Sequence, residues 1–498
     1  MRQSFNPQFE LGATPIAEIK FNLRSRDDIP KILRGLQFIY GCEATRGAVF
    51  DILHKGIGED VDFNNGRPGM DLWVLLVLGT LRLGLNCDFD RLHDLANEHK
   101  TIRAMLGHGG WCDEYQYGLQ TLRDNVALLS EEMLQEINAL VVKEGHKLVK
   151  KKDDDILKGR CDSFAVETNV EHPTDTGMLW DAMRKTIILT SRLCDFYKIE
   201  GWRQASYNLL RLKSHWRKAQ RSNRSRQKDA EVKKKKAHQK YLRITQQYFH
   251  RSVESVEQLQ VKASSQPPGD SLDNLQNQLD KIAFFQAYAV KLMDQITRRV
   301  LEEENIPTAE KIYSIFQPHT EWISKGKAGV QVELGVKVCI MEDQHQFILH
   351  HQVMEKTQDV DVAVSMVTQT QKYFPSLGSC SFDKGFHSPS NQIELIKHLD
   401  QVVLPKKGKM TSEEKTRTNA PEYKKERRQH SAVESAINGL EQYGLDRCPD
   451  HGIEGFRRYV ALSVLSRNLQ RIGAILTEKE RAEARRKRQR IYRYRKAA

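Results

Sequence analysis

The strongest constraint on the fold is that strand-like segments occur on both sides of a long helical segment. Residues 162–170 (DSFAVETNV) alternate between apolar and polar side chains, which is the pattern of a β-strand. The next comparable segments are 330–340 and 346–353, whereas residues 176–305 are rich in charge and have helical spacing. We therefore predict an α/β core that is interrupted by a helical insertion.

The remainder of the core is an alternation of strands and helices after the insertion. Short strands are expected at 379–383 and 401–405. Helices are expected at 360–374, 391–399, 426–443 and 455–476. Strands that alternate with helices in this way predict a mixed-sheet α/β layer fold, with its core in residues 151–475.

Residues 1–150 are predicted to form a separate helical domain. The apolar run 71–79 follows a Gly66–Gly69 turn and suits a buried helix, and apolar residues at helical spacing continue through 89–106. Short helices joined by tight turns are typical of helix-turn-helix modules, and equally of any small helical domain. A DNA-binding domain is therefore one of two interpretations.

The insertion is expected to be a long helical hairpin at 181–305 with one very basic arm. Residues 203–243 are dense in Lys and Arg, and a turn at 264–270 precedes an apolar, heptad-like stripe at 272–296. A solvated charged helix without a ligand is the alternative. The segment 476–498 also carries many Arg and Lys residues, as a frayed helix or a nucleic-acid-binding arm.

Charge and cysteine content narrow the class of protein. The 498 residues carry a net charge of +13, which favours a polyanionic partner such as nucleic acid. On charge alone, a basic cytosolic protein without such a partner is an equal alternative. The eight cysteines are scattered and form no CxxC pair, so neither a zinc ribbon nor a disulfide scaffold is indicated. The sequence contains no secretory signal, no long apolar run and no GxxxxGK[ST] loop. We expect a cytoplasmic protein that neither enters a membrane nor uses a nucleotide cofactor.

Three acids are candidate catalytic residues. Asp162 is expected to open the first strand, Asp383 to end a later one, and Glu434 to lie partly buried beside an apolar helix stripe. A single acid is usually a surface residue, so only their joint placement indicates a site. Converging carboxylates need a cation to offset their charge, and their oxygen atoms suit Mg²⁺. Asp175 and Glu441 are the rival acids.

Local sequence around these acids resembles bacterial insertion-sequence transposases of the DDE type, and most closely the group named ISNCY. The similar blocks are DSFAVETNV with HPTDTGMLW at 162–180, KGKAG at 325–329, SFDKGFHS at 381–388, RRQHSAVESAIN at 427–438, and the segment 455–469. The resemblance spans residues 162–475, and more loosely the N-terminal region.

The resemblance implies an RNase H-like catalytic core that holds two Mg²⁺ ions, with Mn²⁺ as a substitute. Asp162 would bridge both ions, while Asp383 and Glu434 would each hold one. The position seven residues after Glu434 is Glu441, where related families have a basic residue. The residues expected to contact DNA are Arg427, His430, Lys384, Lys325, Lys327, Lys233, Lys234, Lys235 and Lys236.

The implied activity is cleavage of double-stranded DNA at terminal inverted repeats, followed by joining of the 3′-hydroxyl to target DNA. Residues 1–150 would bind the repeats, and a homodimer or larger assembly would hold two ends together, at the nucleoid of a bacterium. A Mg²⁺-dependent nuclease without strand transfer is one alternative. A catalytically silent DNA-binding protein is the other.

Overall fold

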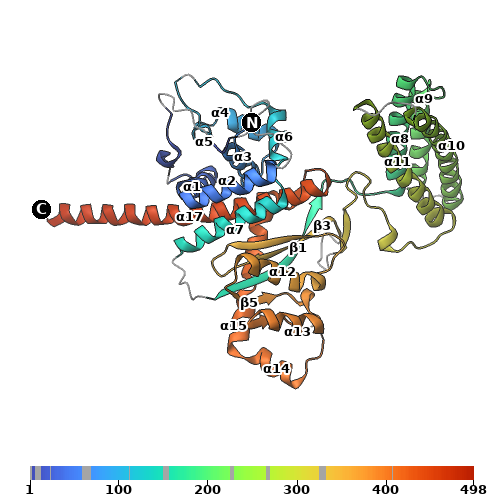
Figure 1. The fold of residues 1–498 in the computed structure, drawn as a ribbon. Coiled ribbons are helices and arrows are strands. Elements are labelled where there is room, and N and C mark those ends of the chain that lie inside the picture. Colours follow the sequence, from blue (N-terminus) through green and yellow to red (C-terminus); the bar gives the residue numbers. More distant parts are fainter. Residues whose placement is uncertain are drawn as a thin grey trace. The chain divides into compact units, whose positions relative to one another are not determined.

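A computed structural model shows the chain as two compact units (Figure 1). Unit 1 consists of Met1–Asn169 and Gly335–Ala498, and unit 2 of Val170–Leu334. The structure describes residues 3–5, 13–22, 24–58, 69–111, 113–149, 156–224, 229–264, 270–324, 332–406 and 408–497. Lys325, Lys327 and most of the Gly66–Gly69 turn lie outside these ranges.

Unit 1 combines one sheet with helices from both ends of the chain. Its strands are β1 (Leu157–Thr168), β3 (Val332–Glu342), β4 (Ile348–Met354), β5 (Leu377–Phe382), β6 (Gln401–Val403) and β7 (Arg447–Cys448). Its N-terminal helices are η1 (Ile16–Glu18), α1 (Ile29–Gly41), α2 (Glu43–Gly58), α3 (Leu72–Gly84), α4 (Phe89–Glu98), α5 (Lys100–Met105), α6 (Leu119–Val126) and α7 (Glu131–Leu148). The later helices are α12 (Asp359–Tyr373), η4 (Lys384–Phe386), α13 (Pro389–His398), α14 (Ser412–Asn419), α15 (Pro421–Gln429), α16 (Ala432–Leu440), η5 (Glu441–Leu445) and α17 (Gly452–Ala497).

The sheet is mixed, as the sequence predicts. The main path of the sheet is β2 (Glu321–Ser324), β3, β1, β5 and β6, while β4 also pairs with β3 and β7 pairs with the end of β1. The pairs β4–β3 and β3–β1 are antiparallel, whereas β1–β5 and β5–β6 are parallel. A central β1 therefore has an antiparallel neighbour on one side and a parallel neighbour on the other. The mixed α/β class is confirmed.

The N-terminal helices share a core with the sheet. One continuous set of buried apolar side chains extends from Ile16 on η1 through Val166 on β1 to Ile475 on α17. Helix α3 is buried along its entire length, as its apolar run predicts. Helix α17 packs on α1, α3 and α7, and its exposed C-terminal part continues as helix beyond them (Figure 1). Residues 476–497 are therefore helical.

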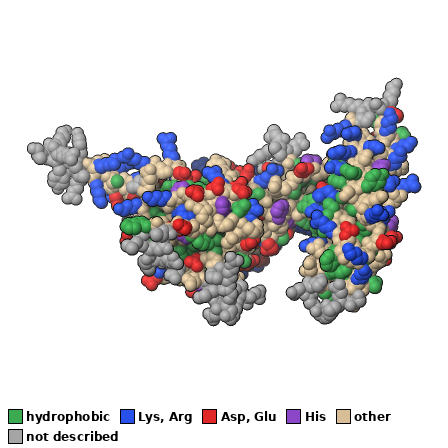
Figure 2. Space-filling view, turned by 90° about the horizontal axis from the view of Figure 1, so that it is seen from above, with side chains coloured by type: hydrophobic (Ala, Val, Ile, Leu, Met, Phe, Trp, Pro, Cys, Tyr) green, Lys and Arg blue, Asp and Glu red, His purple; other side chains and the backbone are tan. Residues whose placement is uncertain are grey.

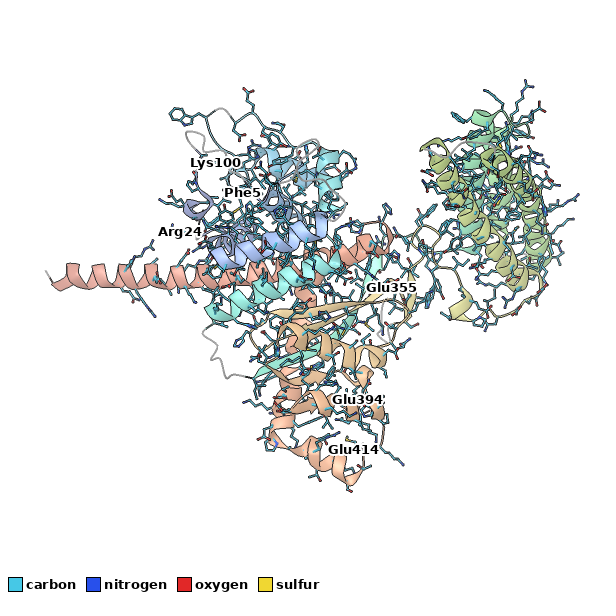
Figure 3. All side chains as sticks on the ribbon, in the orientation of Figure 1. Phe5, Arg24, Lys100, Glu355, Glu394 and Glu414 are labelled. Atoms are coloured by element: carbon cyan, nitrogen blue, oxygen red, sulfur yellow. The ribbon has the colours of Figure 1, made fainter. Side chains whose placement is uncertain are left out.

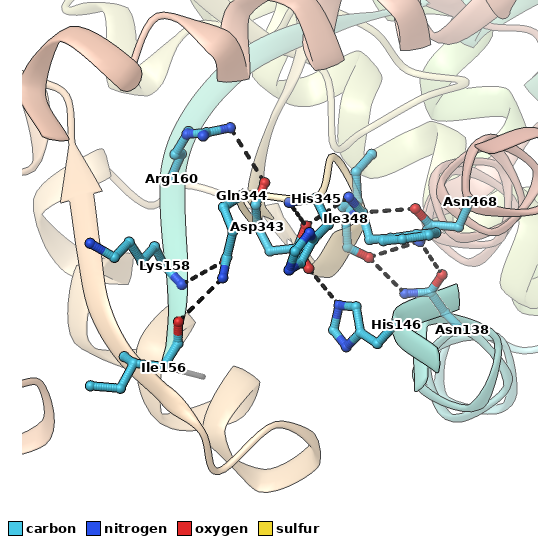
Figure 4. A network of polar contacts seen from close by, with 11 residues as sticks. Asn138, His146, Ile156, Lys158, Arg160, Asp343, Gln344, His345, Ile348 and Asn468 are labelled. Carbon is cyan, nitrogen blue, oxygen red and sulfur yellow. Dashed lines mark hydrogen bonds and ion pairs between the residues drawn. The ribbon is translucent and has the colours of Figure 1, made fainter. Parts of the chain in front are cut away.

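A buried polar network anchors the turn between β3 and β4 (Figure 4). The carboxylate of Asp343, which is fully buried, pairs with His146 of α7 at 2.5 Å. Asn468 of α17 accepts a hydrogen bond from the N–H of Ile348 at 3.0 Å and donates one to its carbonyl at 2.8 Å. Arg160 of β1 donates to the Asp343 carbonyl at 3.3 Å. The network thus ties β1 to α7 and α17, because buried polar groups need such partners.

Glycines allow α1 and α17 to approach each other closely. A Cβ atom on Gly35 of α1 would overlap the carbonyl oxygen of Leu469 on α17. A Cβ atom on Gly473 of α17 would overlap the carbonyl oxygen of Lys31 on α1. Both clashes are with backbone, which cannot move aside as a flexible side chain can.

Gly35→Ala is therefore expected to destabilise unit 1 by about 1–3 kcal/mol, because overpacking would force the two helices apart. Thermal unfolding should show a lower midpoint. Gly41→Ala is the matched control on the same helix, because no atom lies within 4 Å of its added Cβ. That control should be neutral or slightly stabilising. Equal midpoints for the two variants would contradict the close crossing.

Unit 2 is a helical bundle with its own core. Its elements are α8 (Asp175–Tyr197), α9 (Ala205–Ser222), α10 (Ala230–Ser264), α11 (Asp270–Ile296), η2 (Thr297–Leu301), η3 (Thr308–Glu310) and β2 (Glu321–Ser324). The sequence predicts a two-helix hairpin at 181–305, and this prediction is wrong in its helix number. Helices α10 and α11 are the two expected arms, but α8 packs along α11 and α9 along α10. The reason is that α8 carries its own apolar stripe, including Leu179, Met183 and Ile187.

No helix within the described ranges is long and apolar enough to cross a membrane.

Candidate active site

The pairing of β1 with β5 brings two of the predicted acids together. Cys161 on β1 is in register with Phe382 on β5 in this parallel pair. The residues that follow them, Asp162 and Asp383, are therefore neighbours across the two segments. Asp383 directly follows β5, as predicted. Asp162 does not open its strand, because β1 begins at Leu157 and the acid lies in the middle. The alternation used to predict the strand starts only at Asp162, so the sequence pattern misses the first residues of β1.

Helix α16 supplies the third acid. Val433, Ala436 and Ile437 are buried, and the helix packs on β1. Glu434 lies in the first turn of α16 and is exposed, so the prediction that it is partly buried is wrong. Glu434 follows the buried Val433 in sequence, but its own side chain is exposed to solvent.

Asp162 interacts electrostatically with both other predicted acids. Burial raises the pKa of Asp162, the negative charges of Asp383, Asp359 and Glu434 add to this effect, and together they bring the pKa to about 6. The N–H of Ser163 donates to Asp162 Oδ1 at 2.8 Å and opposes this rise. Negative charge is thus concentrated around a carboxyl group that is mostly withdrawn from water.

A divalent cation fits the donor set of this region. Carboxylate oxygens are the ligands that Mg²⁺ prefers, and a cation would relieve the repulsion that raises the pKa of Asp162. No three acidic, His or Cys side chains within the described residues are already gathered closely enough to hold a metal ion.

A fourth carboxylate, Asp359 at the start of α12, lies beside the predicted three. Ser163 Oγ donates to Asp359 Oδ1 at 2.7 Å, and Lys337 Nζ of β3 lies 3.2 Å from the same oxygen. A Cβ atom on Gly385 would lie 2.8 Å from Asp359 Oδ2, so the segment after Asp383 runs against this carboxylate. No sequence pattern singles out Asp359, because acids are common at the start of a helix.

The basic residues predicted near the acids occupy different environments. His430 Nδ1 is hydrogen-bonded to Ser381 Oγ of β5 at 3.0 Å, two residues before Asp383. Burial lowers the pKa of His430, against the opposing charges of Asp383 and Glu434. Lys384 and Arg427 are exposed.

Lys384, the residue after Asp383, and Arg427 line a cavity of about 390 Å³. Lys406 and Tyr423 also line it, and within the described residues the buried Tyr423 hydroxyl has no hydrogen-bond partner. Lys406 is paired with Glu414 of α14 at 2.9 Å; Glu414 is labelled in Figure 3. The cavity therefore presents positive charge beside Asp383.

The rival acids are less well placed. Asp175 begins α8 in unit 2, where it pairs with Arg299 at 2.5 Å. Glu441 begins the π-helical turn η5 after α16, two helical turns beyond Glu434. Glu434, by contrast, contributes to the raised pKa of Asp162.

The lysine run of unit 2 is largely occupied by ion pairs. Lys233 pairs with Asp229 and Lys234 with Glu231, each at 3.0 Å. Lys235 pairs with Glu303, and Lys236 is exposed. These pairs reduce the positive charge that the run can offer to a ligand.

Comparison with known families identifies the region that contains two of the three acids. Residues 294–469 match the family model of the transposase DDE domain. The matched region includes Asp383 and Glu434, and Asp162 precedes it. No curated protein and no solved structure matches the chain. The match supports a DDE transposase that acts on DNA, and it implies the RNase H-like fold with which the mixed sheet agrees.

Proposed function

We propose that this chain is a DDE transposase of the insertion-sequence type, similar to the ISNCY group of bacteria. It would cut double-stranded DNA at the terminal inverted repeats of its element and join the freed 3′-hydroxyl to target DNA. One observation carries the proposal. The β1–β5 register makes Asp162 and Asp383 neighbours beside Glu434, and the last two lie in a region that matches the transposase DDE domain.

In this proposal, Asp162, Asp383 and Glu434 hold two Mg²⁺ ions, for which Mn²⁺ can substitute. Bound ions of this kind activate the attacking water or hydroxyl and offset charge on the phosphate. Asp162, whose charge interacts with those of both other acids, would contact both ions. Asp383 and Glu434 would each bind one.

Other side chains would bind and orient the DNA. Lys384 and Arg427 would contact a phosphate from the cavity that they line. His430 would position β5 through Ser381 as well as facing the DNA. The N-terminal helices would bind the terminal repeats, and a dimer or larger assembly would hold two ends. Lys325, Lys327 and the run Lys233–Lys236 remain predicted DNA contacts.

The decisive experiment incubates the full chain with DNA that carries the gene's native flanking sequences. A transposase should cut at the element ends and form joined products in Mg²⁺, and do neither in EDTA. Cleavage without joining would favour the nuclease alternative. Binding without any cleavage in Mg²⁺ or Mn²⁺ would favour a catalytically silent DNA-binding protein.

Asp359→Asn should lower the cleavage rate by about 10–100-fold, the usual effect of losing a residue that supports metal ligands. The Asp359 carboxylate accepts a hydrogen bond from Ser163, the residue after Asp162. It also lies against Gly385, two residues after Asp383. Removing one negative neighbour should also let the pKa of Asp162 fall, so the rate should reach half its plateau at lower pH. A pH–rate profile measures both effects.

Asp361→Asn provides a matched control for that substitution. Asp361 lies on the same helical turn as Asp359, but its carboxylate accepts from the N–H of Gln358 instead of contacting β1. It should leave the pH midpoint of cleavage in place. A similar midpoint shift in both variants would show that the effect comes from α12 as a whole.

A further inference from the structure

Helix α9 and the adjoining part of α10 form a strongly basic surface of unit 2. We define the α9 face by the exposed residues Arg203, Arg211, Arg217, Lys218, Arg221 and Arg251. Helix α9 contains no Asp or Glu at all. In Figure 2, Lys and Arg side chains gather densely on unit 2, at the right of the view.

The α9 face is hollowed at two places. A groove of about 910 Å³ between α9 and α10 is lined by Arg203, Arg211 and Arg251, with Glu254 as its one acidic residue. A second hollow of about 230 Å³ further along α9 is lined by Arg217, Lys218 and other residues of the helix. Concave surfaces of one charge sign concentrate counter-ions, so this surface is suited to an extended anion.

The arginines of the groove are available to a ligand. Within the described residues, no ion pair joins Arg203, Arg211 or Arg251 to a carboxylate, in contrast to Lys233, Lys234 and Lys235. The charges also act on a neighbour. Burial lowers the pKa of His215, and the charges of Lys218, Arg211 and Lys240 lower it further.

Aromatic side chains are interleaved with these cations. The Arg251 guanidinium lies 5.7 Å from the ring centroids of both Trp202 and Tyr248, which orients it. Tyr248 lines the groove and is 3% exposed, yet its hydroxyl has no hydrogen-bond partner within the described residues. Tyr207, which is 60% exposed, lies at the same groove. The exposed Tyr207 ring and the Arg251 guanidinium therefore lie at the same groove.

We infer that the α9 face binds the phosphate backbone of duplex DNA. Unpaired arginines, a concave surface and an exposed aromatic ring are the chemistry that recognises a nucleic-acid backbone. The choice of DNA over RNA rests on the proposed function. The 18 residues of α9 span about 27 Å, enough to follow several phosphates along a duplex. The surface lies outside the matched transposase region, so it would be an additional DNA contact of this chain.

The test measures binding of the full chain to a fluorescent duplex of unrelated sequence, in EDTA, across a series of salt concentrations. Arg203→Gln, Arg211→Gln and Arg251→Gln are combined in one variant. Three lost phosphate contacts should make the slope of log K against log salt shallower by about 2.7, and weaken binding at least about 10-fold at 0.1 M salt.

The matched control combines Arg184→Gln, Arg298→Gln and Arg299→Gln in the same unit. It removes the same charge from arginines that are paired with acids, so the slope should change by less than about 1. Equal changes in the two variants would overturn the inference, because net charge alone would explain binding. Tighter binding of an RNA hairpin, lost in the first variant, would also overturn it.

This assay is independent of catalysis, because EDTA removes divalent metal. A chain that shows the slope change in the first variant only, but neither cuts nor joins its native flanking DNA, would retain the α9 face and lose the proposed function. The opposite result would retain the transposase and lose the α9 face. Circular dichroism should show unchanged helix content in both variants, because none of the six substituted side chains is buried.

Discussion

Replacing Glu434 by Gln is expected to lower Mg²⁺-dependent DNA cleavage and joining by about 10³-fold or more, while DNA binding persists. The amide keeps the size of the side chain but removes the charge that a divalent ion needs. Glu434 is exposed, so its loss should cost the fold little. An effect of this size is usual when a group that acts in the transition state is removed.

Glu441→Gln is the discriminating control for this prediction. Glu441 has the same chemistry and lies two helical turns further along, in the π-helical turn after α16. It should keep cleavage and joining within a few-fold of the original protein. The measurement is a single-turnover time course on native flanking DNA with both variants. If Glu441→Gln is inactive and Glu434→Gln is active, the third metal-binding carboxylate is Glu441.

The sequence predicts the sheet well because its strands carry period-two alternation or short apolar runs. The segments 330–340 and 346–353 become β3 and β4 with ends shifted by a few residues. Once strands are assigned, acids at their ends can be recognised, and this is how Asp383 is found. The parallel register that sets Asp383 beside Asp162 is a long-range property, and no local pattern encodes it.

Features that depend on packing between distant segments are missed. The joining of the N-terminal helices to the sheet in one core depends on α17, which packs on α1, α3 and α7. Asp359 is missed because its role depends on Ser163 and Lys337, which lie on two other elements. The apolar stripe of α8 is present in the sequence, but the dense charge of residues 203–243 is the stronger local pattern.

The exposure of Glu434 and the ion pairs of Lys233–Lys235 depend on side-chain packing that a local pattern does not contain. A helical wheel places Glu434 beside a buried stripe, but it does not say which side of the stripe the sheet leaves open. A run of lysines indicates positive charge, yet Asp229, Glu231 and Glu303 offset most of it. Side-chain pairing therefore decides which basic segment can bind an anion.

Asp162→Asn is expected to abolish cleavage by a similar factor of about 10³ or more and, at the same time, to stabilise the metal-free protein at neutral pH. Asp162 has a pKa of about 6 in the folded chain, against 3.8 as its ordinary value. The folded state therefore binds the proton more tightly than the unfolded state does. The stability that this provides is complete below about pH 4 and is lost as the pH rises through about 6.

Above that pH, Asp162 is ionised, and its partly buried, repelled charge lowers the free energy of unfolding. Asn carries no charge and has no such effect. The variant should be more stable by about 1–3 kcal/mol at pH 7.5 in EDTA, and the difference should vanish near pH 4. Mg²⁺ should stabilise the original protein above pH 6 only, because protons compete for the same oxygens. It should not stabilise the variant. Urea unfolding across this pH range measures each of these differences.

Glu131→Gln supplies a control of opposite sign in the same unit. Burial opposes ionisation of Glu131, but His351 and Arg457 outweigh it and lower its pKa. Its charge therefore stabilises the fold above its unfolded pKa, and that stability is lost as the pH falls through the folded pKa. The Gln variant should be less stable than the original protein at pH 7.5. If Asp162→Asn also destabilises the metal-free protein there, the carboxylates do not repel one another, and the argument for a metal at Asp162 fails.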